Sequence, residues 1–130
     1  LYGMTRTTGR NEIIRAALDS IVLQIQAVLD AMSKDSGFQI EELGADGGPT
    51  QNRYLMQMQS DISRLTVAIS DVEELSALGA AYLAGISVGL YEKKKLFAQR
   101  QKVRYTPKMP EEQRQHKLHD WNRAVELLMR

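Results

Sequence analysis

The 130-residue sequence predicts an α/β fold that is rich in helix and contains one short parallel βαβ unit. Apolar residues recur at spacings of three and four from residue 12 to residue 32, which is typical of a helix with one buried face. Two strand-like runs flank a second helical stretch within roughly 27 residues, close to the usual size of a βαβ unit. An alanine- and glycine-rich run, residues 77–90, predicts a further buried helix.

Composition narrows the class of protein. Lys and Arg number 17 against 16 for Asp and Glu, so the net charge of +1 favours neither a nucleic acid partner nor an acidic membrane surface. The absence of Cys excludes a disulfide framework and fits a cytoplasmic location. The longest apolar run has 14 residues, whereas a bilayer span needs about 20. Because the sequence begins at Leu1 without an initiator Met, we expect a fragment of a longer polypeptide.

The first helix is expected to end at Asp35-Ser36-Gly37, since glycine favours helix termination. A strand over residues 43–45 precedes an Asp-Gly-Gly-Pro turn, a helix opens at Thr50, and residues 65–69 form a second, parallel strand. The residues expected to be buried on the first helix share one face and are Ile14, Leu18, Ile21, Ile25, Val28, Leu29 and Met32.

The C-terminal half predicts two more helices. Ser70 and Glu73 have capping-box spacing, so a third helix is expected from near Asp71 to about Tyr91, and its small residues allow close packing on a sheet or neighbouring helix. The segment from there to Pro107 is interpreted as a connector. Pro110 marks the start of a last helix, whose expected apolar stripe is Leu118, Trp121, Val125 and Leu128.

The turn at residues 46–52 is the candidate binding site, because ligands of open parallel sheets bind where strands end. Gly47 and Gly48 allow a ligand to approach the backbone, and the free N–H groups of the following helix favour phosphate. The alternatives are a plain tight turn, with Asn52 only capping the helix and Asp46 only satisfying turn amides. The glycine spacing fits neither a Walker loop nor a dinucleotide fingerprint.

Other candidate residues favour structural roles. His116 and His119 could share a metal, but no carboxylate or Cys partners match them, so a solvent-facing pair is the preferred interpretation. Trp121 is interpreted as the anchor of the last helix. The sequence shows no nucleophile–base arrangement, and we therefore predict no catalytic residue in this chain.

Four stretches in order and spacing resemble the C-terminal domain of the FGGY family of carbohydrate kinases, most of all its glycerol kinases. The first stretch comprises Gly3-Met4, Glu12-Ile13 and residues 16–19, and the second comprises residues 46–48, Asn52 and residues 55–62. The third is residues 74–85, and the fourth comprises residues 105–107 and 121–125. Two departures, at residues 49–51 and 71–74, leave the substrate open among polyols, pentoses, hexoses and tetritols.

The resemblance implies the C-terminal part of an actin-like ATPase (ribonuclease H-like) domain. It implies a cleft holding ATP and Mg²⁺, in which a polyol or sugar hydroxyl attacks the γ-phosphoryl group. By position, Gly48 would meet the phosphate and ribose, Gly47 would give room beside it, and Asn52 would hold the adenosine end. The catalytic base and sugar-binding residues would lie upstream, so residues 1–130 are expected to be inactive alone.

The sequence also leaves two other hypotheses about the function open. One is a non-catalytic adenine-nucleotide-binding or regulatory module of actin-like fold, and the other is a purely structural helical interaction protein. The expected partners are ATP and a small polyol or sugar. A unit with only about two core strands would expose an apolar sheet edge, so a homo-oligomer is also expected.

Overall fold

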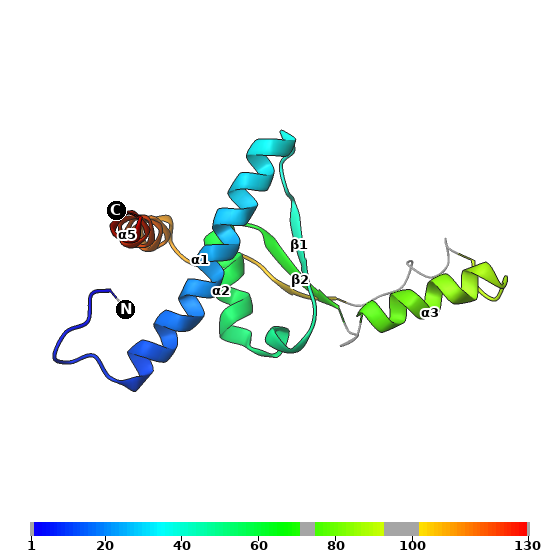
Figure 1. Ribbon diagram of the computed structural model, residues 1–130, viewed down its shortest axis with the longest axis horizontal. Coiled ribbons are helices and arrows are strands. Elements are labelled where there is room, and N and C mark those ends of the chain that lie inside the picture. The colour runs from blue at the N-terminus through cyan, green and yellow to red at the C-terminus, as the bar shows by residue number, and fades with distance from the viewer. Residues whose placement is uncertain (1, 71–74, 93–101, 130) are drawn as a thin grey trace.

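The computed structural model describes residues 2–70, 75–92 and 102–129 as a small three-stranded sheet with helices packed beside it and one helix that extends away from it (Figure 1). The sheet order is β1-β2-β3. Along the chain the elements are α1 (Arg10–Ser36), β1 (Glu42–Ala45), the 3₁₀ helix η1 (Gly48–Gln51), α2 (Arg53–Ser63), β2 (Thr66–Ser70), α3 (Leu75–Ser87), β3 (Lys102–Tyr105) and α5 (Glu111–Leu128).

The predicted βαβ unit is confirmed. β1 and β2 are parallel neighbours, with Leu43 opposite Val67 and Ala45 opposite Ile69, and α2 connects them. α1 ends where it was expected, because Gly37 adopts the left-handed conformation (φ 68°) and its N–H bonds the carbonyl of Ser33.

The third strand was not predicted. Residues 102–105 were expected to belong to a connector, but they pair antiparallel with β2, with Tyr105 opposite Val67 and Val103 opposite Ile69. A four-residue strand alternates only twice, which is too little periodicity to recognise from sequence. β2 is therefore the central strand and has both edges paired.

The core lies between α1, α2 and β2, and α2 contributes most of it. α2 is amphipathic, and its buried side chains interdigitate with those of α1 and the sheet. Burying a large apolar side chain of this kind contributes about 1.5–3 kcal/mol. The core cluster consists of Val22, Leu23, Leu55, Met56, Met58, Ile62 and Val67.

The predicted buried stripe of α1 is largely wrong. Only Leu18 and Leu29 of that stripe lie on the covered side, whereas the remaining large side chains are exposed. α1 is apolar on two faces, and α2 covers one of them, so periodicity alone does not reveal which face this chain buries. The buried residues are Val22, Leu23, Gln26 and Leu29, and the exposed ones are Ile14, Ile21, Ile25, Val28 and Met32.

α3 differs from its prediction in its end and its packing. The helix ends at Ser87 rather than near Tyr91, because Gly89 is left-handed (φ 77°) and the Leu90 N–H bonds the Gly85 carbonyl at 2.8 Å. It projects away from the sheet, so the expected close packing on a sheet or helix is wrong for the described chain (Figure 1). Its predicted start, with Asp71 and Glu73, falls outside the described residues. Among the helices described, none is long and apolar enough to span a membrane.

α5 docks on the C-terminal end of α2 through polar contacts. The buried carboxylate of Asp61 accepts hydrogen bonds from the backbone N–H of Lys108 at 2.6 Å and of Met109 at 3.1 Å. Arg64 donates to the Met109 carbonyl at 2.8 Å and pairs with Glu111. The buried Asp61 carboxylate, hydrogen-bonded in this way, fixes the approach of the start of α5 to α2.

Only the first half of the predicted α5 stripe is buried. Leu118 and Trp121 pack against the core, as expected, whereas Val125 is exposed and Leu128 is 86% exposed. α5 extends past the edge of the small core, so its last turns cover no apolar surface among the residues that the structure describes. Pro110 lies directly before the helix, which begins at Glu111.

Acid is expected to loosen the α5 contact through Glu111. Hydrogen bonds from Gln115, Arg64 and Arg114 lower the pKa of Glu111 from its ordinary value of 4.5 to about 2. A depressed carboxyl pKa stabilises the fold above pH 4.5, and this stabilisation is lost as the pH falls from 4.5 to about 2. In urea unfolding across that window, Glu111→Gln should show a flatter pH dependence than the parent. Identical slopes in the two proteins would contradict this assignment.

Candidate functional site

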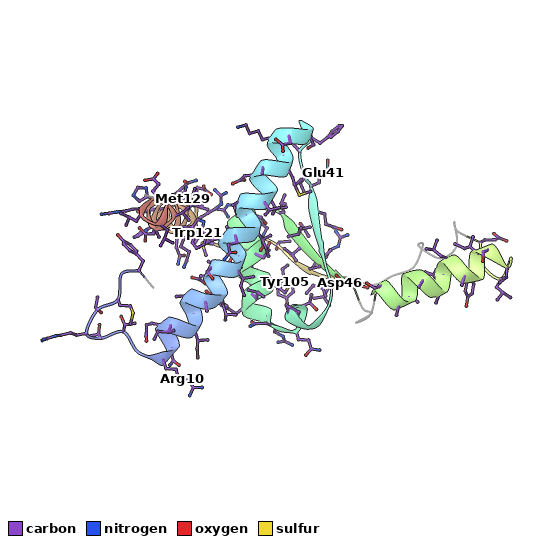
Figure 2. All side chains as sticks on the ribbon, in the orientation of Figure 1. Arg10, Glu41, Asp46, Tyr105, Trp121 and Met129 are labelled. Carbon is purple, nitrogen blue, oxygen red and sulfur yellow. The ribbon has the colours of Figure 1, made fainter. Side chains whose placement is uncertain are left out.

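The candidate site is the turn that joins β1 to α2. Figure 2 shows Asp46 at the end of β1, where the chain leaves the sheet. The site therefore lies at the carboxyl end of a parallel strand, as the sequence predicted. One detail was wrong, because Thr50 does not open α2. Residues 48–51 form a 3₁₀ turn, Asn52 is the N-cap, and α2 begins at Arg53.

Gly47 shapes this turn through its backbone. Its φ of 84° and ψ of −179° fall in a region that essentially only glycine adopts. The Gly47 carbonyl accepts from the Thr50 N–H at 3.0 Å and from the Thr50 hydroxyl at 2.7 Å. These two bonds hold the turn closed, and Thr50 is a supporting residue that sequence reasoning did not single out.

Gly48 is a glycine that the described fold does not require. It is exposed, it is absent from the glycines with positive φ, and a Cβ built on it would meet no described atom within 4 Å. Neither backbone conformation nor internal packing therefore explains the missing side chain. What glycine provides here is open space directly above the backbone, where a ligand could approach.

Asn52 caps the start of α2, which was one of the two roles predicted for it. Its Oδ1 accepts a hydrogen bond from the Leu55 N–H at 3.1 Å. Within the described part of the chain, its Nδ2 makes no hydrogen bond, so this donor is free to meet a ligand at the mouth of the turn. The two readings are compatible, because they use different atoms of one amide.

The first turn of α2 adds electrostatic preference for anions. The leading N–H groups of a helix have no intrahelical acceptor and carry partial positive charge. Arg53, exposed at the first helical position, adds a full positive charge, whereas the exposed Asp46 places a carboxylate at the other end of the turn. The arrangement suits a ligand with anionic oxygens near Arg53 and neutral polar groups elsewhere.

The predicted secondary candidates take structural positions. His116 contacts Asp120 through Nδ1 at 3.0 Å, and both side chains are mostly exposed. Among the residues that the structure describes, no three His, Cys, Asp or Glu side chains gather in a way that could hold a metal ion. Trp121 is half-buried against the core, as expected of a helix anchor.

Comparison with known proteins decides the family. The description "FGGY family of carbohydrate kinases, C-terminal domain" matches residues 1–88, which include α1, the turn at residues 46–52, α2 and α3. This chain belongs to the FGGY family. The resemblance read from the sequence is therefore confirmed, and the turn lies inside the matched region of this FGGY chain.

Individual relatives agree with the FGGY assignment. Glycerol kinase from Staphylococcus epidermidis is 42% identical over 128 residues, which is 96% of this chain and 26% of the relative. The crystal structure of Plasmodium falciparum glycerol kinase with ADP superimposes with a TM-score of 0.83 at 36% identity, over 96% of this chain and 26% of that one.

More distant FGGY kinases share the fold. A xylulose kinase from Rhodospirillum rubrum has a TM-score of 0.78 at 24% identity, over 98% of this chain and 26% of its own. The predicted fold class is thus confirmed, with a mixed rather than wholly parallel sheet. The chain spans about a quarter of the length of the relatives it matches.

Proposed function

We propose that the full-length protein transfers the γ-phosphoryl group of ATP to a hydroxyl of a polyol or sugar, as in glycerol kinases. This chain supplies part of the adenine-nucleotide site. The observation that carries the proposal is Gly48, whose open backbone position serves no internal purpose of the described fold. Membership of the FGGY family and the ADP in the related Plasmodium structure support it.

Each residue of the turn has a role in this proposal. Gly48 lies against the phosphate and ribose, where a side chain would block approach. Gly47 shapes the turn, and the free Nδ2 of Asn52 donates to the adenosine end. The N–H groups at the start of α2 stabilise anionic oxygens. Nothing in this set abstracts a proton, so the base belongs to another part of the polypeptide.

Mg²⁺ stays a prediction from the resemblance. The resemblance assigns most protein ligands of the ion to the remainder of the polypeptide, and we propose the same assignment here. When bound, Mg²⁺ would neutralise phosphate oxygens during transfer. This chain would contribute binding and orientation of the nucleotide.

We further propose that residues 1–130 are the C-terminal part of the FGGY C-terminal domain, with the catalytic and sugar-binding part elsewhere. Two surfaces support this. α1 exposes an apolar face along its length, and β1 forms an edge of the described sheet. Further strands beside β1 would pair its edge and could extend under that face of α1.

ATP consumption by the full-length protein tests the proposed function. Glycerol, erythritol, pentoses and hexoses should be compared, and turnover is expected with at least one of them. The isolated 130-residue chain is expected to show none, because half a cleft cannot position both substrates. Tight ATP binding by the full-length protein without any turnover would favour the regulatory-module alternative.

Side chains introduced at Gly48 are expected to weaken nucleotide binding in order of their size. Gly48→Ala should raise the ADP Kd several-fold and Gly48→Val by at least about tenfold, or about 1.4 kcal/mol. Isothermal titration of the full-length variants measures this. Gly44→Ala is the matched control, since Gly44 is another glycine with open space around it. An ADP Kd unchanged in Gly48→Val would remove the turn from the nucleotide site.

Three further expectations stay predictions: a homo-oligomer, a cytoplasmic location and no nucleic acid partner. The exposed apolar side chains of α1 are compatible with self-association of the isolated chain. Sedimentation of the full-length protein would establish the oligomeric state.

A further inference from the structure

Three helices meet at one carboxylate on the side of the core near the start of α2. Asp19 of α1 accepts from the Tyr54 hydroxyl of α2 with Oδ1, and from Lys117 Nζ of α5 with Oδ2 at 2.8 Å. The guanidinium of Arg15 lies 4.7 Å from the centroid of the Tyr54 ring. We call these four residues, Arg15, Asp19, Tyr54 and Lys117, the Asp19 cluster.

The cluster is sheltered enough for its contacts to matter. The Asp19 side chain is 14% exposed and that of Lys117 25%. Charge-assisted hydrogen bonds in such partly buried positions are roughly twice as strong as neutral ones. Burial and the Asp19 carboxylate raise the pKa of Tyr54 to about 12, so the phenol keeps its donor proton at neutral pH.

Tyr54 follows the N-cap Asn52 by two residues and therefore belongs to the first turn of α2. Its hydrogen bond to Asp19 fixes the start of the helix against α1. The other hydrogen bonds described between the α5 region and α2 use Asp61, Arg64 and the carbonyl of Ile62, all near the far end of α2. The Asp19 cluster thus links α5 to the end of α2 that carries the candidate site.

We propose that Tyr54 is a positioning residue for the nucleotide-binding turn and that it couples the contact of α5 with α1, and not the contact of α5 at the far end of α2, to nucleotide binding. This inference rests on the proposed function. By holding the first turn of α2, Tyr54 fixes the cap amide of Asn52 and the adjoining 3₁₀ turn. Since coupling is reciprocal, bound nucleotide should in turn stabilise the contact between α5 and α1.

Nucleotide titration of the full-length protein tests the positioning role. Tyr54→Phe keeps the ring and removes the donor, and it should raise the ADP Kd and the ATP KM about three- to tenfold with kcat within twofold. Glu111→Gln is the matched control, because it loosens α5 at the far end of α2. Glu111→Gln should lose thermal stability but keep the ADP Kd of the parent. If Tyr54→Phe behaves in the same way, the role of Tyr54 is structural only and the proposal fails.

Hydrogen exchange of the same proteins with and without saturating ADP tests the coupling. In the parent, ADP should slow exchange of the amides of residues 111–128, and Tyr54→Phe and Lys117→Met should abolish this slowing. Equal slowing in the parent and both variants would overturn the coupling. If the parent does not bind ADP, the proposed function is refuted. If the parent binds ADP and ADP slows hydrogen exchange equally in the parent and the variants, only this inference is refuted.

Discussion

Asp61→Ala is expected to release the start of α5 and to lower the free energy of unfolding by about 2–4 kcal/mol. Asp61 is 7% exposed, and its carboxylate accepts hydrogen bonds from the backbone N–H groups of Lys108 and Met109 and from the Gln57 amide, the last at 3.0 Å. Alanine removes the shared acceptor, so two backbone N–H groups beside α2 lose their partner. The loss exceeds that of a single hydrogen bond because several donors depend on one side chain.

Urea unfolding of the full-length protein measures this loss, and hydrogen exchange over residues 108–118 locates it. Asp120→Ala provides the comparison on α5 itself, since the ion pair described for Asp120 is an exposed one with His116, and its loss should cost under about 0.5 kcal/mol. An Asp61→Ala protein as stable as Asp120→Ala would show that Asp61 does not hold the α5 junction.

Gly47→Ala is expected to raise the ADP Kd at least about tenfold and to destabilise the protein by about 1–3 kcal/mol. Among the described residues, a Cβ would meet nothing closer than the Pro49 Cδ at 4.0 Å, so the cost arises from the backbone conformation and not from a clash. Relief of that strain would rotate the Gly47 carbonyl away from Thr50 and open the turn.

The control for Gly47→Ala is Gly37→Ala. Gly37 also has a positive φ, with φ 68° and ψ 4°, but it lies at the C-terminus of α1. The Gly37→Ala protein should therefore be less stable than the parent and keep its ADP Kd. Calorimetric titration of the full-length proteins measures the Kd. If both glycine variants bind ADP as the parent does, the shape of the turn has no part in nucleotide recognition.

Local signals predicted much of this fold. The helix stop at Gly37, the strand before the turn and the β-branched second strand are each encoded by a few adjacent residues. The turn at residues 46–52 was predicted from the order of a strand, two glycines and a helix. The position of Asn52 near the start of α2 could be predicted, but its role could not, because the oxygen that caps the helix and the amide group that is free to donate to a ligand belong to the same side chain.

The parts that were missed depend on distant residues. The covered face of α1 is chosen by α2, and both faces of α1 are apolar. β3 becomes a strand because β2 offers it an edge. The Asp19 cluster joins side chains 35 and 98 positions apart, at Tyr54 and Lys117, so no spacing rule could reveal it.

The position of β3 in the chain bears on how the protein is made. β2 is complete at Ser70, but the strand that closes its second edge ends only at Tyr105, after α3. During synthesis β2 therefore emerges with one row of backbone N–H and C=O groups unpaired for more than thirty residues of further translation. Exposed strand edges template association with other chains. A ribosome that stalls between β2 and β3 would thus release a product with an open sheet edge, and the C-terminal strand serves as the closing element of this sheet.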